Sequence, residues 1–538
     1  MSILDTFVAH APALIVAIPL LGAFLVQLVG RLHEKAKVVF ALLTILLTNC
    51  FLYLLTYDVF TNGIRTYIFG NADLTLPVVR ILFEVDAMSI YMALISTTLI
   101  LVAFIFSWVY MKDNTGLDKF YTLMLLLTAG MLGMVFTGDI FNFFVFLEIT
   151  GISSAALVAF WVHKAEAVEA GFKYILISAI GALFVLFAIA LLYGQYDALN
   201  IAVLAQSIQF TFLDKIALVI LLVSLAMKAG LFPMHMWLPD SYSRAPAPVT
   251  IGLVAATLAS FYGVLRVIFS LYGGIYSGTD LALLSTLTST KFMGSLLIGL
   301  ALLAILVGVI MALRQTDLKR LIAFAAVAEI GYMFLGIGTW MAAKTVHVDP
   351  DGVATAISIL PYGNLALQGG IFHLFNDAFD IGLLFLVAGV IFFVTKERSL
   401  DNLSGLARHM KATTIFFIIG LCAVAGLPPL NGFASKLLLY ESTFQLNPIL
   451  GIVAIVGSIL LLAVFVKVFY AAFMGPDLIK TNVHKEPRSM IIAMGILAAV
   501  IIIIGLFPDL FLTHFVEPAT DALLNFSSYT NAVLIGGV

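Results

Sequence analysis

The chain has 538 residues, of which 62% are hydrophobic and only 11% are charged, and its mean hydropathy is +1.13. Soluble domains carry roughly 25% charged residues, so this composition excludes a soluble protein and indicates a polytopic membrane protein. No basic tract is present, which argues against nucleic acid as a partner, and the formal net charge of −3 indicates no other class of partner. Both cysteines, Cys50 and Cys422, lie inside apolar runs, so neither a disulfide nor a cysteine metal site is expected.

Apolar runs follow one another along nearly the whole chain. At about 20 apolar residues per crossing, they predict about fourteen membrane-spanning helices. The first run lacks a preceding basic region, so we interpret it as a retained span rather than a signal peptide. The predicted spans lie near 7–30, 38–57, 87–111, 120–137, 140–162, 174–194, 216–234, 246–272, 292–313, 321–341, 363–394, 412–440, 449–474 and 490–512.

The distribution of basic residues supports this order of spans. Of the 27 lysines and arginines, eighteen fall in one set of alternating loops, five in the other set and four within spans. Because cytoplasmic loops are enriched in Lys and Arg, this asymmetry predicts a multi-pass protein of the cell (plasma) membrane with both termini outside. The outside loops 58–86 and 273–291 mix apolar and polar residues, and we expect them to lie on the membrane surface.

Two predicted spans are interrupted by glycine and proline. One breaks between Lys228 and Pro233, and the other breaks between Gly426 and Lys436, five spans later. An odd offset reverses the direction through the membrane, and interrupted helices at matching positions of inverted halves point to a transport path. We therefore predict an all-α fold with two inverted five-helix repeats, each containing a broken helix. The divisions are 1–111 (helices 1–3), 112–272 (first repeat, helices 4–8), 292–474 (second repeat, helices 9–13) and 490–538 (last helix and external tail).

Charged residues occur inside several predicted spans. A lipid-facing charge costs about 3 kcal/mol, so eight of them would cost on the order of 24 kcal/mol, which exceeds the stability of a typical domain. Most must therefore face the interior of the bundle. Two of them, Arg266 and Lys467, lie nearer span ends, and we expect their side chains to snorkel. The others are Glu148, Lys228, Glu329, Asp377, Asp380 and Lys436.

Glu148 and Lys228 have the chemistry of a switching pair. Burial alone would neutralise either group, whereas pairing keeps both charged, and moving the partner would load or release a proton. The alternative is a static interhelical ion pair. His235, which follows the first break, is a candidate proton relay or, equally, a hydrogen-bonded packing residue.

His373, Asp377 and Asp380 are spaced i, i+4 and i+7, so they share one face of a helix. Two carboxylates one turn apart repel unless a proton or a cation lies between them. We predict a protonatable cluster or a Na⁺ site at Asp377 and Asp380; the alternative is a set of polar groups that seals a bent helix. Nothing resembles a phosphate loop, a nucleophile elbow or a metal-ligand run, so we expect no cofactor and no catalytic site in this chain.

Several motifs together resemble one superfamily over roughly residues 85–490. They are Phe-Asn-Phe-Phe-Val-Phe-Leu-Glu at 141–148, Lys-Ala-Gly-Leu-Phe-Pro-Met-His-Met-Trp-Leu-Pro-Asp at 228–240, Ala-Pro-Ala-Pro at 245–248, Asp-Leu-Lys-Arg-Leu-Ile at 317–322, and Gly-Leu-Pro-Pro at 426–429 followed by Lys436. They are similar to the antiporter-like subunits of respiratory complex I, Mrp-type multisubunit Na⁺/H⁺ antiporters, membrane-bound hydrogenases and sulfane reductases. The stretch 137–148 is most similar to the Mrp D and hydrogenase H types.

The resemblance implies fourteen helices, two inverted repeats and a central hydrated axis. It also implies that Glu148, Lys228 and Lys436 carry protons, and that any redox chemistry belongs to partner subunits. The implied partners are other membrane subunits, including small helical and other antiporter-like subunits, the lipid bilayer, and H⁺ and/or Na⁺.

The chain departs from the family at three spans. Span eight usually carries a lysine, but the neighbourhood of Leu258 is apolar, with only Thr257 and Ser260 polar. Span eleven carries His373, Asp377 and Ile381 where relatives often have two histidines and a lysine, and Glu329 stands where span ten often has a histidine. Carboxylates carry protons but are also the oxygen ligands that hard cations prefer.

We therefore predict an ion-translocating subunit of a multisubunit respiratory or antiporter complex. Glu148 and Lys228 would form the switching pair, Lys436 the terminal relay, and Glu329, His373, Asp377 and Asp380 the middle of the path. The first alternative, supported by the missing lysine of span eight, is a structural subunit with an incomplete path that bridges active neighbours. The second is a stand-alone transporter of a small solute.

Overall fold

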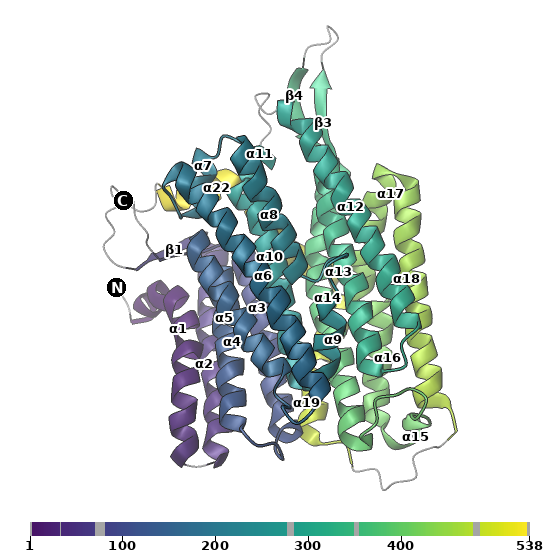
Figure 1. The fold of residues 1–538 in the computed structure, drawn as a ribbon. Coiled ribbons are helices and arrows are strands. Elements are labelled where there is room, and N and C mark those ends of the chain that lie inside the picture. Colours follow the sequence, from purple (N-terminus) through teal and green to yellow (C-terminus); the bar gives the residue numbers. More distant parts are fainter. Residues whose placement is uncertain are drawn as a thin grey trace.

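Long helices run side by side through the molecule, and two short β-hairpins lie at its upper end (Figure 1). The computed structural model describes residues 3–32, 34–69, 81–276, 284–348, 354–476 and 485–534. Backbone groups in hydrocarbon must be satisfied within the segment, which is why apolar stretches of this length form helices. The elements are α1 (Ile3–Leu32), α2 (Glu34–Asn62), β1 (Arg65–Ile68), β2 (Leu82–Val85), α3 (Ala87–Tyr110), α4 (Leu117–Phe136), α5 (Ile140–Val158), α6 (Ala165–Tyr196), α7 (Ile201–Ser207), α8 (Phe212–Lys228), α9 (Trp237–Arg244), α10 (Ala247–Arg266), η1 (Val267–Leu271), α11 (Gly273–Tyr276), α12 (Leu284–Leu313), α13 (Leu318–Ala342), β3 (Lys344–Val348), β4 (Ala354–Ile359), α14 (Pro361–Thr395), α15 (Leu406–His409), α16 (Lys411–Val424), α17 (Asn431–Leu446), α18 (Pro448–Val468), η3 (Phe469–Met474), α19 (Arg488–Leu506), α20 (Pro508–Phe511), η4 (Leu512–Val516), α21 (Glu517–Leu524) and α22 (Phe526–Leu534).

The described residues contain 12 helices that are long and apolar enough to cross a membrane. They occupy twelve of the predicted spans, which confirms the class of polytopic helical membrane protein. The two remaining predicted spans, 216–234 and 412–440, are formed by helix pairs that meet at a break, α8 with α9 and α16 with α17. The count of fourteen crossings depends on each pair crossing once and stays a prediction.

The two breaks have the same backbone design. Residues 229–233 read Ala-Gly-Leu-Phe-Pro and residues 425–429 read Ala-Gly-Leu-Pro-Pro. Gly230 and Gly426 adopt positive φ values of 78° and 72°, a conformation that suits glycine because it lacks a Cβ. In each break the glycine N–H and the following leucine N–H donate to carbonyls of the last helical turn, the usual glycine termination of a helix.

A second matched feature lies at the starts of α5 and α13. Ile140 N donates to Leu199 O and Ile201 N to Gly138 O; in the other half, Leu318 N donates to Arg398 O and Leu400 N to Thr316 O. Asp139 and Asp317 cap the two helices. The first set lies at the upper end of the bundle and the second at the lower end (Figure 1). This opposition is what inverted repeats would produce; the repeat boundaries themselves stay a prediction.

The two halves meet along buried helices. The apolar windows of α10 and α13 are fully buried, and α10 packs against α14 while α9 packs against α13. Lys319, at the start of α13, donates from Nζ to Ala245 O at 2.8 Å and to Thr250 Oγ1 at 2.9 Å. This buried ammonium holds the turn between α9 and α10 against the second half.

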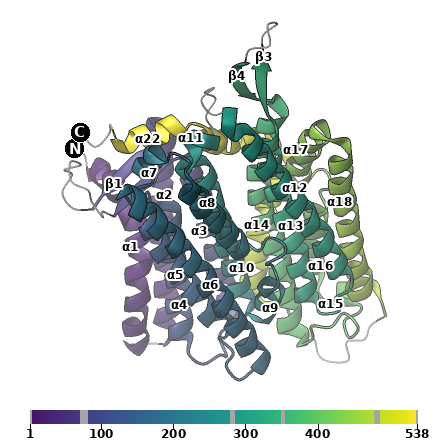
Figure 2. The ribbon, with the colours of Figure 1, turned by 45° about the horizontal axis from the view of Figure 1, so that its top comes forward.

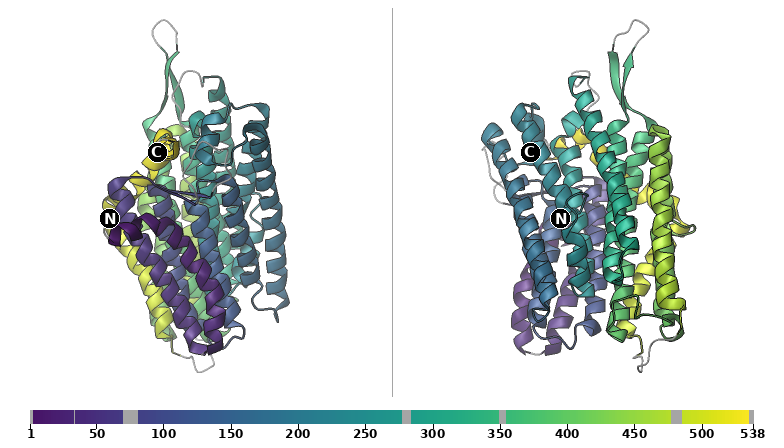
Figure 3. Two further views of the ribbon diagram at one scale, coloured as in Figure 1. Left: turned by 90° about the vertical axis from the view of Figure 1, so that its left-hand side faces the viewer. Right: turned by 45° about the vertical axis from the view of Figure 1, so that its right-hand side comes forward.

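Short elements cover the upper end. Figure 2 shows α7, α11 and α22 lying across that end, with β3 and β4 projecting beyond it. The side views show the same hairpin standing clear of the helices (Figure 3). Strands β1 and β2 pair from Arg65↔Val85 to Ile68↔Leu82, so the predicted outside loop 58–86 contains a hairpin. Parts of both predicted outside loops, 70–80 and 277–283, lie outside the described residues.

Candidate ion-translocation site

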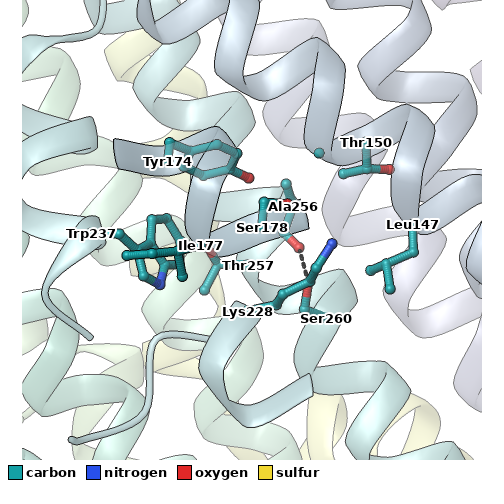
Figure 4. A pocket seen from close by; sticks show the side chains of 11 residues that line it. Leu147, Thr150, Tyr174, Ile177, Ser178, Lys228, Trp237, Ala256, Thr257 and Ser260 are labelled. Carbon is teal, nitrogen blue, oxygen red and sulfur yellow. Dashed lines mark hydrogen bonds between the residues drawn. The ribbon is translucent and has the colours of Figure 1, made fainter. Parts of the chain in front are cut away.

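Lys228 is the last residue of α8, and the helix break leaves its side chain at the edge of a small pocket. The residue is only 8% exposed, and Nζ has no hydrogen-bond partner among the described residues. Figure 4 shows the side chain extending between the helices that surround the pocket. A buried ammonium without acceptors is costly, so its position suits a group that changes partners. The polar lining consists of Thr150, Tyr174, Ser178, Trp237, Thr257 and Ser260.

Glu148 does not complete the predicted pair in this structure. It lies half-buried on α5, near enough to Lys228 to act on the ammonium electrostatically, but it does not accept a hydrogen bond from Nζ. A Cβ on Gly151, three positions farther along α5, would lie 3.7 Å from Nζ. The ammonium therefore lies against the turn of α5 that follows Glu148.

A buried ion pair forms in the second half instead. Lys436 Nζ donates to Glu329 Oε1 at 2.9 Å, and His373 Nε2 lies 3.0 Å from Glu329 Oε2. All three side chains are at most 2% exposed. The predicted terminal relay and two members of the predicted middle thus lie in one contact cluster.

The second break supplies further acceptors to Lys436. Its ammonium donates to Val424 O, the last carbonyl of α16, at 2.6 Å and to Ser458 Oγ at 3.1 Å. Nζ also lies 4.6 Å from the ring centroid of Tyr332. The carbonyl end of a helix carries partial negative charge, which stabilises the ammonium there.

Asp377 and Asp380 lie beside this cluster, both buried. Asp380 Oδ1 accepts from Asn431 Nδ2 at 3.0 Å, whereas Asp377 Oδ1 has no hydrogen-bond partner in the part of the chain that is described. Among those residues no group of three or more His, Cys, Asp or Glu is placed to hold a metal ion. The Na⁺ site at the two aspartates stays a prediction.

Tyr242 in α9 and Thr257 in α10 lie on the two elements that pack against helices of the second half. Tyr242 Oη and Thr257 Oγ1 are 2.7 Å apart, and Thr257 also lines the Lys228 pocket. Asp377 acts electrostatically on the Tyr242 hydroxyl from the other side. His235 is buried with Nδ1 unpartnered among the described residues, so both of its predicted roles stay open.

An ionic cleft opens at the lower end, and the sequence did not predict it. Asp240 pairs with Lys173 at 3.1 Å and with Arg320 at 3.0 Å, and Arg244 pairs with Glu166 at 2.9 Å. These residues line one polar cleft. The signal was available in the sequence, because Asp240 lies only seven positions after Pro233 of the first break.

The prediction that Arg266 snorkels is wrong. Its side chain is 6% exposed, and Nη2 donates to Asp86 Oδ1 at 2.5 Å. The position of Arg266 within its span did not predict this pairing, because its partner Asp86 lies outside the spans, as the N-cap residue of α3. Lys467, in contrast, is exposed and donates to Leu313 O at 2.8 Å, as snorkelling predicts.

The fold and these buried charges define a polytopic membrane protein with ionisable groups in its interior. A family model described as "NADH:quinone oxidoreductase/Mrp antiporter, TM" matches residues 137–348 and 352–462, and one described as "NADH-Ubiquinone oxidoreductase (complex I), chain 5 N-terminus" matches 77–121. The chain belongs to this family of antiporter-like membrane subunits.

Two relatives illustrate the range of the family. One Na(+)/H(+) antiporter subunit from Alkalihalophilus pseudofirmus is 30% identical over 82% of this chain and 54% of its own length. The chain therefore spans about half the length of that relative. NADH-quinone oxidoreductase subunit N of Desulforudis audaxviator is 30% identical over 95% of this chain and 98% of its own length.

Solved structures share the fold over nearly the whole chain. A chain of the membrane-bound sulfane sulfur reductase, an archaeal respiratory membrane complex, matches with a TM-score of 0.82 and 27% identity, covering 97% of this chain and 100% of that one. A chain of the Mrp complex from Dietzia sp. matches with a TM-score of 0.82 and 24% identity, covering 98% and 100%. Both neighbours belong to multisubunit membrane complexes.

Proposed function

We propose that the chain is an ion-translocating, antiporter-like subunit that moves H⁺ and/or Na⁺ within a multisubunit respiratory or antiporter complex. The observation that carries this proposal is Lys228: a buried ammonium without a hydrogen-bond partner among the described residues, set in a polar pocket where a membrane helix breaks. Ionisable groups within membrane spans mark ion paths because they are too costly to keep otherwise.

Lys228 and Glu148 would act as a switch. When the ammonium moves toward Glu148, the pair keeps both groups charged; when it moves away, burial favours the neutral amine and a proton is released. The polar groups of the pocket would stabilise the intermediate positions. An ion bound more tightly in one arrangement than in the other shifts the equilibrium between them.

Two kinds of relatives support this substrate class. One is named as part of a Na⁺/H⁺ antiporter and the other as part of a quinone oxidoreductase. We propose H⁺ as the transported ion of the first half, because its groups are titratable, and either H⁺ or Na⁺ at Asp377 and Asp380. Partner membrane subunits, some small and some antiporter-like, would supply any redox chemistry.

The proposed location is the cell membrane, with both termini outside. The support is the eighteen basic residues predicted in one set of loops, against five in the other. The lower end in Figure 1, with the ionic cleft, would then face the cytoplasm.

A structural subunit remains the second candidate, and the Lys436 cluster favours it. Three acceptors surround the three donors of that ammonium. Such a saturated pair holds helices together without needing to move. In this case the chain would bridge active neighbours and carry no current.

Transport in reconstituted membranes separates the two candidates. We expect Lys228→Ala and Glu148→Gln to abolish coupled transport in proteoliposomes containing the whole complex, while the subunits still co-purify. Lys215→Ala, which removes an ammonium from the outer start of α8, is the matched control and should transport normally. Wild-type transport by both site variants would exclude the switch and leave the structural role.

A further inference from the structure

The upper end of the first half holds a buried ionic cluster that the switch does not use. Arg266 Nη2 donates to Asp86 Oδ1 at 2.5 Å and to Ser89 Oγ at 3.0 Å, and Nε donates to Tyr262 Oη at 2.7 Å. From above, the ring of Tyr529 in α22 lies 4.9 Å from the guanidinium carbon. This cluster is therefore enclosed by four elements, which are β2, the start of α3, α10 and α22.

Glu84 adds a second carboxylate to a cluster that contains one guanidinium. It is 1% exposed, and neither carboxylate oxygen accepts a hydrogen bond of ordinary geometry among the described residues, although the Tyr529 hydroxyl faces it. Two carboxylates thus share one guanidinium. The titratable and charged groups that face Glu84 are Asp86, Arg266 and Tyr529. Burial raises the pKa of Glu84 well above its usual range; Arg266 opposes this rise and Asp86 adds to it.

A small apolar cavity lies against Arg266, about one helical turn from the Lys228 pocket, with which it shares no lining residue. Arg266 lines the cavity together with residues of α5, α8 and α10. On each of these helices, a residue that lines the cavity lies three or four positions, or about one turn, from a residue that lines the pocket. The pairs are Phe143 with Leu147, Leu225 with Lys228, and Gly263 with Ser260.

We propose that Glu84, Asp86 and Arg266 form the outer proton-exchange site of the first half, with the apolar cavity between Phe143, Leu225 and Gly263 as the gate to Lys228. This proposal rests on the proposed function, because Lys228 is the group it serves. Glu84 releases its proton to the outer side and becomes a carboxylate. It then accepts the proton that the Lys228 ammonium gives up through water, which leaves a neutral amine and a neutral acid. Arg266 holds Asp86, so that Glu84 is the carboxyl group free to titrate.

The gate follows from the lining of the cavity. Apolar constrictions conduct only while water fills them and close when they dry. A Cβ on Gly263 would lie 2.7 Å from Phe143 Cζ, so this glycine keeps the constriction open. Proton passage would therefore depend on transient wetting at Gly263.

The first test removes the titration of Glu84 without changing its shape. Proteoliposomes containing the whole complex with Glu84→Gln should transport about tenfold more slowly or worse, and the rate should no longer depend on the pH of the outer compartment. Glu517→Gln, in α21, is the matched control and should keep the wild-type pH profile. An unchanged rate and pH profile for Glu84→Gln would overturn the proposal.

The second test leaves every charge in place. Gly263→Ala should slow transport with the outer-pH midpoint unchanged, whereas Gly194→Ala, where a Cβ meets nothing within 4 Å, should transport normally. Wild-type transport by Gly263→Ala would overturn the gate even if Glu84→Gln failed to assemble. If Lys228→Ala abolishes transport and both outer variants transport normally, only the outer site fails. If Lys228→Ala transports normally, the proposed function fails.

Discussion

Each half of the chain places a buried lysine beside a broken helix, yet the two lysines are in opposite states. Lys228 precedes its break and has no hydrogen-bond partner among the described residues, whereas Lys436 follows its break and donates to Glu329, Val424 O and Ser458. The backbones of the two breaks are alike, so the difference lies in where the ammonium is attached. An unsaturated ammonium is free to move, and a saturated one holds its neighbours.

Aligning the two breaks shows how the difference arises. Lys228 aligns with Val424, and Lys436 aligns with Asp240. In the second half, the lysine reaches back to the carbonyl of the residue that aligns with Lys228. In the first half, the aligned aspartate points to the lower cleft, where it pairs with Lys173 and Arg320. The first break is therefore followed by a residue of the surface cleft, whereas the second break is bridged by the hydrogen bond from Lys436 to Val424 O.

The largest expected effect on stability comes from replacing Lys436, and replacing Lys228 should have no such effect. Lys436→Met leaves Glu329 buried without its ammonium, which should cost about 3–5 kcal/mol of unfolding free energy. Lys228→Met should be neutral or stabilising, because it removes an unpaired buried charge. Denaturation of the purified complex would measure both. Equal destabilisation by the two variants would contradict the comparison, and Glu329→Gln added to Lys436→Met should recover much of the loss.

The next largest effect on stability is expected at Asp139, which caps the start of α5 as Asp317 caps the start of α13. Burial raises the pKa of Asp139 to about 6, so the folded state binds more protons than the unfolded chain between about pH 4 and pH 6. Stability is lost as the pH rises through this window, and Asp139→Asn, which keeps the helix cap, should stabilise the protein at pH 7 by about 1–3 kcal/mol.

The counterpart in the other half serves as the control for that prediction. Asp317 pairs with Arg244 at 3.5 Å and is partly exposed, so Asp317→Asn should lose no more than about 1 kcal/mol. Melting curves at pH 4 and pH 7 would measure both variants. A stabilisation by Asp139→Asn that is as large at pH 4 as at pH 7 would refute titration of Asp139 as its cause.

The boundary between the halves offers a smaller effect. Thr257→Val removes the hydroxyl partner of Tyr242 and should cost about 1 kcal/mol. If charge crosses between the halves here, this variant should also slow transport, whereas Thr128→Val, whose hydroxyl bonds within its own helix, should not. Unaltered transport by Thr257→Val would mean that the halves work independently.

The smallest effect is expected at the lower cleft. Arg320→Gln breaks a partly exposed pair with Asp240 and should change the unfolding free energy by less than about 1 kcal/mol. Its effect on transport should fade as ionic strength rises, because salt screens exposed charges. A transport defect that persists at high salt would place Arg320 inside the path rather than at its mouth.

Most of the helical arrangement could be predicted from the sequence because the bilayer leaves few choices. Apolar length gave the spans, and the Gly-Pro runs at 230–233 and 426–429 gave both breaks. The inverted relation of the two breaks rests on the count of spans and stays a prediction. The hairpins were not predicted, because β1 and β2 are only four residues each and 70–80 separates them.

The partners of the charged groups could not be predicted with the same success. Glu329 and Lys436 are 107 positions apart, and which face each presents depends on helix rotation and packing, which apolar runs do not encode. For the same reason, the sequence could not show that Lys228 Nζ makes no hydrogen bond to Glu148 in this structure. Asp86 and Arg266 are 180 positions apart; the helix-start signal of Asp86 followed by Ser89 was present, but depth alone suggested solvent for Arg266.

The most direct test compares structures of the assembled complex at low and high pH, with these side chains resolved. If Lys228 is the moving group, its Nζ should contact Glu148 in one condition and leave it in the other. Lys436 should stay on Glu329, at the 2.9 Å seen here, in both. A Lys228 that keeps one position in both structures while Lys436 separates from Glu329 would contradict the account.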